Sequence, residues 1–168
     1  MGLIAIASKA EPGKETPAEA AFKFHWKNGR GNLRYCWLIC TQDALATNLE
    51  RFRAIATSSA QTATPLKLLE NPDTVLQPER EAGRTVQMQT VVIDWPSAQD
   101  PNYVKYLVDR IYRQAQALSI DSQSIIADYT GGIKSTSAGV ILACSTPERR
   151  LQYASGHYDE TASFKAPK

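Results

Sequence analysis

Short apolar runs alternate with helix-like patterns along the chain. The apolar runs occupy residues 3–7, 35–40, 91–93 and 125–127. Because these runs are continuous rather than alternating, they are typical of strands that are buried on both faces of a parallel sheet. A further segment, residues 150–154, precedes a Ser-Gly-His turn and a second short stretch, which together are typical of a β-hairpin. The pattern therefore predicts a sheet built from several short strands.

Helical patterns fill the intervals between these runs. Their first residues carry helix signals, because Thr and Asp side chains cap helix N-termini and proline fits the first turn. The predicted helices begin at Thr16-Pro17, at Asp43 and at Asp100-Pro101, and a final helix spans residues 133–144 and stops before Pro147. Strands that alternate with helices predict βαβ units with right-handed crossovers.

Together these elements predict an α/β fold: an open, mainly parallel sheet with helices on both faces and a C-terminal β-hairpin. A length of 168 residues suits a single domain over residues 1–168. Residues 70–84 contain two prolines and several charges, and we expect a loop or a weak edge strand there.

The charge of the chain is nearly balanced, with 19 Lys and Arg against 17 Asp and Glu and a net charge of +2. This net charge is too small for a general affinity for nucleic acid, so an anionic ligand needs a local site. No apolar run approaches the length of a membrane span, and the short apolar N-terminus lacks the layout of a signal peptide. We therefore expect a cytoplasmic protein without a membrane partner.

The cysteine and histidine pattern argues against a metal site. Cys36, Cys40 and Cys144 lie in apolar stretches without C-x-x-C spacing, so we expect buried thiols rather than disulfides or a zinc cluster. His25 and His157 are far apart, and no His, Cys or carboxylate group has metal-ligand spacing. The sequence predicts neither a metal nor a cofactor.

Residues 125–139 carry the most informative pattern: a buried strand, a Gly-Gly turn and a helix that begins with small hydroxyl residues. Gly131 and Gly132 let the backbone approach a ligand closely, and a helix N-terminus offers free N–H groups to a phosphate. Lys134 adds a full positive charge to the first turn. The hydroxyl groups that can donate to phosphate or ribose oxygens are those of Thr130, Ser135, Thr136 and Ser137.

The same pattern has a plainer interpretation, in which the two glycines only make a tight strand-to-helix turn and Thr130 caps the helix. Spacing alone does not separate the two interpretations. The segment has neither the G-x-x-x-x-G-K spacing of a P-loop nor the G-x-G-x-x-G spacing of dinucleotide-binding folds. This disfavours nucleoside triphosphates and NAD as ligands.

Residues 128–139, which read Asp-Tyr-Thr-Gly-Gly-Ile-Lys-Ser-Thr-Ser-Ala-Gly, resemble the signature of the CRISPR-associated Rossmann-fold (CARF) family. In that family Thr and Met are common at the positions of Ile133 and Thr136. Residues 149–153 and the order of the upstream elements are also similar to the family, so the resemblance covers nearly the whole chain. Its specific part is the Thr-Gly-Gly-x-Lys segment. The resemblance implies a Rossmann-like fold.

The resemblance also implies a homodimer that binds a cyclic oligoadenylate across its two-fold axis. The ligand is most often cyclic tetra-adenylate, a signal of type III CRISPR antiviral defence. Two loops of each subunit form such a site, one of which follows the first strand, here Ser8 and Lys9. The implied residues of the second loop are Thr130, Gly131, Gly132, Ile133, Lys134, Ser135, Thr136 and Ser137. This placement agrees with the rule that open α/β sheets bind ligands at the carboxyl ends of their strands.

Four residues after other predicted strands are weaker candidates for ligand contacts. Thr41 and Gln42 follow the run at 35–40 and are candidates for a base pocket. Asp94 and Trp95 follow the run at 91–93, and the indole of Trp95 could stack on an adenine. Packing at a dimer interface or at the edge of the core is the alternative for Trp95. A turn serine and a solvated lysine are the corresponding alternatives for Ser8 and Lys9.

Three functions remain open at this point. The first is a sensor that binds the ring and passes a dimer rearrangement to a fused or separate effector. The second is a metal-independent ring nuclease, in which a ribose 2′-OH attacks the adjacent phosphate while Lys134 stabilises the developing charge and Ser8 positions the reacting groups. No histidine or carboxylate in the motif is an obvious general base for it. The third is a generic α/β domain that binds a mononucleotide or another phosphate compound.

Overall fold

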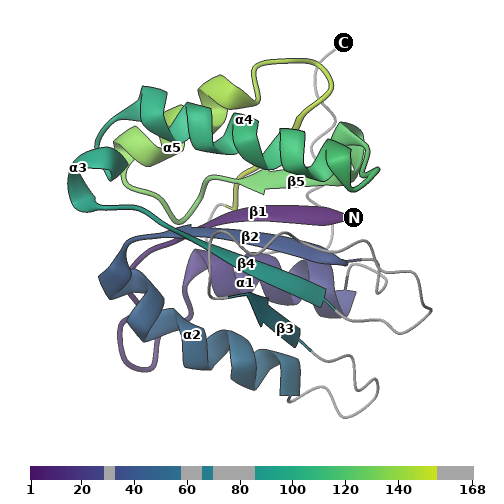
Figure 1. Cartoon of the computed structure of the whole chain (residues 1–168). Helices are drawn as coiled ribbons and strands as arrows, with labels where there is room; N and C mark the ends of the chain where they lie inside the picture. The colour runs from purple at the N-terminus through teal and green to yellow at the C-terminus, as the bar shows by residue number, and fades with distance from the viewer. Residues whose placement is uncertain (29–32, 58–65, 70–85, 155–168) are drawn as a thin grey trace.

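The computed structural model of the chain describes residues 1–28, 33–57, 66–69 and 86–154. Within these residues lies a six-stranded sheet of order β3-β4-β2-β1-β5-β6, in which every neighbouring pair of strands is parallel (Figure 1). The predicted α/β fold with an open parallel sheet is therefore confirmed.

The strands are β1 (Gly2–Ala7), β2 (Tyr35–Cys40), β3 (Leu66–Leu69), β4 (Val86–Val92), β5 (Ile125–Asp128) and β6 (Arg150–Gln152). The α-helices are α1 (Pro17–Lys23), α2 (Gln42–Thr57), α3 (Trp95–Ala98), α4 (Pro101–Ala117) and α5 (Lys134–Ala143). A π-helical turn, η1 (Phe24–Asn28), extends α1, and a 3₁₀ turn, η2 (Ser122–Ser124), precedes β5.

Strand β1 lies at the point where the chain changes direction across the sheet. It pairs with β2 on one side, Gly2 opposite Tyr35, and with β5 on the other, Gly2 opposite Ile125. The chain leaves β1 toward β2 and later returns past β1 to form β5. The connections that follow β1 and β5 thus diverge from one edge of the sheet, which is the topological switch point where open α/β sheets bind ligands.

Helices cover both faces of the sheet, as the sequence predicted. Helices α1 and α2 lie on one face, where Leu3, Phe22 and Phe52 belong to one buried cluster. Helices α3, α4 and α5 lie on the other face, where Ile4 and Val104 belong to a second cluster (Figure 1). Successive residues of β1 enter opposite clusters, which explains why the strand is apolar at every position.

Helices α4 and α5 pack with their backbones close together. A Cβ atom at Gly139 of α5 would lie only 2.6 Å from Cβ of Val104 and 2.7 Å from the carbonyl oxygen of Pro101. No side chain larger than hydrogen fits at position 139 without moving α4 away. The small residue thus sets the spacing of the two helices.

Strand β6 is the described part of the segment in which a hairpin was predicted. Residues Arg150, Leu151 and Gln152 pair in parallel with β5, so this segment is a strand of the main sheet. The physical reason is that α5 carries the chain back along the sheet, so that β6 starts at the same edge as β5. The second arm of the predicted hairpin lies outside the described residues.

The N-terminal caps agree with the sequence at two helices and differ at one. Thr16 forms a capping box with Glu19 at α1, and Asp100 accepts the N–H of Asn102 at α4. Helix α2 begins one residue before the predicted cap Asp43. There Thr41 takes that role, because it follows β2 directly and its Oγ1 accepts the N–H of Ala44 at 3.4 Å.

Two further expectations concern buried thiols and membrane spans. Cys36, Cys40 and Cys144 are free and buried, as predicted, and burial raises the pKa of the Cys40 thiol to about 12. Among the helices that the structure describes, none has both the length and the apolar character needed to cross a membrane.

Candidate functional site at the carboxyl edge of β1 and β5

The Gly-Gly turn after β5 lies directly on the end of β1. A Cβ atom at Gly131 would overlap the carbonyl oxygen of Ile6, and one at Gly132 would lie 3.0 Å from Cδ1 of Ile6 and 2.8 Å from Oγ of Ser137. Among the described glycines only Gly13 has a positive φ, so these two glycines are needed for space and not for an unusual backbone conformation. The close approach brings the predicted phosphate loop to the strand that Ser8 follows.

The first turn of α5 begins without a polar cap. Ile133 is the N-cap residue, and its side chain makes no capping hydrogen bond. Lys134 is the first helical residue, and its side chain is exposed. The N–H groups and the positive end of the helix dipole therefore lie beside one ammonium group.

The hydroxyl groups of α5 are engaged inside the protein. Ser135 Oγ and Thr136 Oγ1 each donate to the carbonyl oxygen of Ala98 at 3.0 Å, and Ser137 Oγ donates to that of Tyr129 at 2.9 Å. Thr130 Oγ1 accepts the N–H of Ala154 at 2.9 Å. These bonds give the hydroxyls a structural role that the sequence did not indicate. The ligand contacts expected of them stay a prediction.

The bonds to Ala98 also tie α3 to the first turn of α5, which places the connection after β4 on the same side of the molecule. Asp94 caps α3 by accepting the N–H of Ser97 at 2.9 Å, and this hydrogen bond lowers the pKa of its carboxyl. The side chain of Trp95 is 57% exposed, so its indole is available for stacking.

The remaining candidates occupy the connections after β1 and β2. Ser8 directly follows β1 and is half-buried, and its carbonyl oxygen accepts the side-chain amide of Asn48 at 2.7 Å. Lys9 is exposed. Thr41 caps α2, and Gln42 is exposed at the first helical position. Because β1, β2, β4 and β5 run in parallel, all of these connections start from the same edge of the sheet.

A series of hydrogen-bonded buried side chains lies next to the Gly-Gly turn, and the sequence did not predict it. The carboxylate of Asp128, 1% exposed, accepts the N–H of Thr130 at 2.9 Å and the side-chain amide of Gln152 at 3.0 Å. Oε1 of Gln152 lies 2.8 Å from Nε2 of His25, and burial lowers the pKa of His25. An Asp two residues before a Thr at a turn is a local Asx-turn signal and could have indicated the first bond.

An aromatic pair flanks the same turn. The rings of Tyr129 and Tyr153 stack with their centroids 5.3 Å apart, and Tyr153 is 58% exposed. Tyr153 follows the edge strand β6, which is why its ring reaches the connection after β5. In the described part of the chain, no three His, Cys, Asp or Glu side chains lie close enough together to hold a metal ion.

A scan against protein-family models and a search of curated proteins found no match to this chain.

Proposed function

We propose that the chain is a sensor that binds a cyclic oligoadenylate, first of all cyclic tetra-adenylate, at the carboxyl edge of β1 and β5. One observation carries the proposal: the Gly131-Gly132 turn lies on the end of β1. As a result, Lys134, the uncapped first turn of α5 and the connection that begins at Ser8 share one edge of the sheet. Such a set of N–H groups and one ammonium group suits a phosphodiester.

The proposal includes a homodimer, because a cyclic ligand with repeated phosphates matches an isologous interface. Two copies of Lys134 and two α5 N-termini then face one polyanion, with the exposed Trp95 as a candidate for stacking on a base. The net charge of +2 fits a local anion site better than a surface with general affinity for nucleic acid. In this function the bound ring changes the dimer, and a fused or separate effector of type III CRISPR defence responds.

Calorimetric titration with cyclic tetra- and hexa-adenylate, linear tetra-adenylate and AMP tests the proposal. We expect one cyclic ring to bind two chains, and Lys134→Ala to weaken binding by about tenfold or more, since each charged hydrogen bond to phosphate is lost in both protomers. Lys105→Ala is the matched control, because Lys105 pairs with Asp109 within α4 at 2.8 Å and lies outside the proposed site. The control should bind like the wild type.

Two other results would reject this function. If no cyclic oligoadenylate binds, the sensor proposal is wrong. If AMP binds with one molecule per chain and as tightly as the rings, the generic mononucleotide domain is the better description.

Ring cleavage is the second candidate, and the contacts in the motif argue against a fast reaction. The buried Asp128 carboxylate already accepts from Thr130 and Gln152, and the hydroxyl groups of residues 135–137 are neutral and too weakly basic to take up the 2′-OH proton. A general base that abstracts the 2′-OH proton needs a free lone pair within hydrogen-bond reach. Chromatography of cyclic tetra-adenylate after long incubation decides this point. Faster loss of the ring with the wild type than with Lys134→Ala would favour the nuclease.

A further inference from the structure

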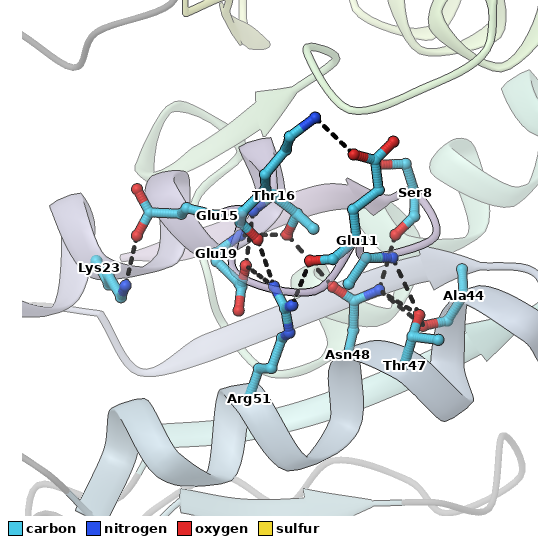
Figure 2. Close-up of polar contacts among 12 residues, drawn as sticks. Ser8, Glu11, Glu15, Thr16, Glu19, Lys23, Ala44, Thr47, Asn48 and Arg51 are labelled. Atoms are coloured by element: carbon cyan, nitrogen blue, oxygen red, sulfur yellow. Dashed lines mark hydrogen bonds and ion pairs between the residues drawn. The ribbon is translucent and has the colours of Figure 1, made fainter.

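The connection between β1 and α1, residues 8–16, makes little apolar contact of its own. Glu11, Pro12, Gly13 and Lys14 are exposed, and Ala10 is its one buried apolar side chain. A loop without apolar packing keeps a single conformation only where polar contacts offset its conformational entropy. The contacts that do this come from one side of α2, as Figure 2 shows.

Thr47 and Asn48 of α2 hold the beginning of this loop. Thr47 Oγ1 accepts the N–H of Ala10 at 3.1 Å. The side-chain amide of Asn48 donates to the carbonyl oxygen of Ser8 at 2.7 Å, and its Oδ1 accepts the hydroxyl of Thr16 at 3.3 Å. Asn48 is fully buried, so its bonds connect the first and last residues of the loop without competition from water.

Arg51, one helical turn further along α2, holds the middle of the loop. Its guanidinium donates through Nη2 to the carbonyl oxygen of Glu11 and through Nη1 to that of Lys14, both at 2.6 Å. Nη1 also pairs with the carboxylate of Glu19 at 3.2 Å, which in turn accepts the N–H of Thr16 at 2.6 Å. One planar fork thus spans the two carbonyls on either side of the Pro12-Gly13 turn (Figure 2).

We infer that Thr47, Asn48 and Arg51 are positioning residues that hold the Ser8 loop of the site in the conformation that accepts the ligand. The inference rests on the proposed function. These three residues act through the loop backbone, since each of them contacts loop backbone atoms. If only a fraction of the molecules keeps the loop in place, the apparent dissociation constant rises by the inverse of that fraction.

Two pairs of variants test the inference. Thr47→Val keeps the shape of the side chain and removes the acceptor for Ala10, whereas Thr47→Ser keeps the hydroxyl. Arg51→Lys keeps the charge and removes the fork, and Arg53→Lys is its control on the same helix, where Arg53 pairs with the exposed Glu50. Thr47 is half-exposed and each of these changes nearly keeps the size of the side chain, so we expect all four variants to fold.

Three measurements are made on each variant: the dissociation constant for cyclic tetra-adenylate, the melting temperature, and amide hydrogen exchange of residues 8–15 with and without the ring. We expect Thr47→Val and Arg51→Lys to weaken binding by about tenfold, as for a loop held in roughly one molecule in ten. Their loop amides should exchange faster without the ring and regain protection with it. Thr47→Ser and Arg53→Lys should resemble the wild type in binding and exchange.

A purely structural role predicts something different: lower melting temperatures with unchanged affinity and unchanged loop exchange at a temperature where the variants are folded. That result would overturn the inference and leave the proposed function intact. If the wild type binds no ring, the proposed function fails. Faster loop exchange in Thr47→Val would then still support the anchoring by α2, and unchanged exchange would overturn it.

Discussion

The two connections at the switch point are fixed in different ways. The β1–α1 loop is held by side chains that reach it from α2, with Arg51 alone bonding to two of its carbonyls. The β5–α5 turn is held by hydrogen bonds of its own residues and by close packing of Gly131 against the backbone of Ile6, where no side chain fits. The first loop has space on its outer side, whereas the second has none where it meets β1.

This difference shows where the proposed site tolerates change. A residue on α2 can alter the first loop without entering the site, because the effect travels through hydrogen bonds to the loop backbone. The second turn accepts no added atom at Gly131, so its position follows directly from that of β1. Substitutions in the two connections should therefore differ in how strongly they destabilise the fold.

The largest effect is expected from Gly131→Ala. The added methyl group overlaps the carbonyl oxygen of Ile6, and a backbone atom in the centre of the sheet cannot move aside cheaply. We expect a loss of about 3 kcal/mol or more in the free energy of unfolding, measured by urea denaturation. Gly13→Ala is the control: Gly13 has a φ of +74° and nothing within 4 Å of the added Cβ, so only the backbone conformation is strained, at about 1 kcal/mol. Equal losses of stability in Gly131→Ala and Gly13→Ala would show that close packing against Ile6 is not what restricts the β5–α5 turn.

A smaller effect is expected from Ser137→Ala. Its hydroxyl donates to the carbonyl oxygen of Tyr129 across the β5–α5 turn at 2.9 Å, and the site is partly buried. Losing this donor should reduce the free energy of unfolding by about 1–2 kcal/mol. Ser145→Ala removes a similar bond, from its hydroxyl to the carbonyl of Leu142 at 2.8 Å, in an exposed position where water replaces the donor. If Ser145→Ala is as destabilising as Ser137→Ala, burial of the turn does not determine the free-energy cost of losing the hydrogen bond.

The smallest effect concerns pH. Burial lowers the pKa of His25 in the folded chain, although its bond to Gln152 and the charge of Asp128 oppose this. The unfolded chain then binds a proton where the folded chain does not, so this contribution to stability is present above about pH 6.5 and is lost as the pH falls through the folded pKa. Urea midpoints between about pH 5 and 8 should fall on acidification. His25→Gln should flatten this dependence, and an unchanged slope in that variant would assign it to other groups.

The apolar runs predicted the centre of the sheet well and its edges less well. β1, β2 and β5 are buried on both faces, and burial of that kind leaves a continuous apolar run in the sequence. Strand β4 begins at Val86, but only its end was predicted, because buried Gln87, Gln89 and Thr90 interrupt the apolar pattern. The parallel pairing of β6 with β5 follows from the order β5–α5–β6 of a βαβ unit, which the hairpin-like pattern of residues 150–154 obscured.

For the candidate site, the sequence predicted the local features and missed the distant ones. The Gly-Gly turn, the start of α5 and the placement of Lys134 follow from neighbouring residues. The anchoring of residues 8–16 by Asn48 and Arg51 joins segments that are far apart in sequence, and a polar residue on a helix gives no local sign of its partner. The hydrogen bonds from two hydroxyl groups of α5 to the carbonyl oxygen of Ala98 also join distant segments and could not be predicted from the sequence.

The position of β1 between β2 and β5 has a consequence for how the chain is made. On one side β1 pairs with β2, which is synthesised soon after it. On the other side β1 pairs with β5, which is synthesised only after α4. Until then an apolar strand presents an open row of backbone N–H and C=O groups, which is a template for aggregation. Fragments that end before Ile125 should therefore precipitate or require a chaperone, even though they contain most of the helices that cover the sheet.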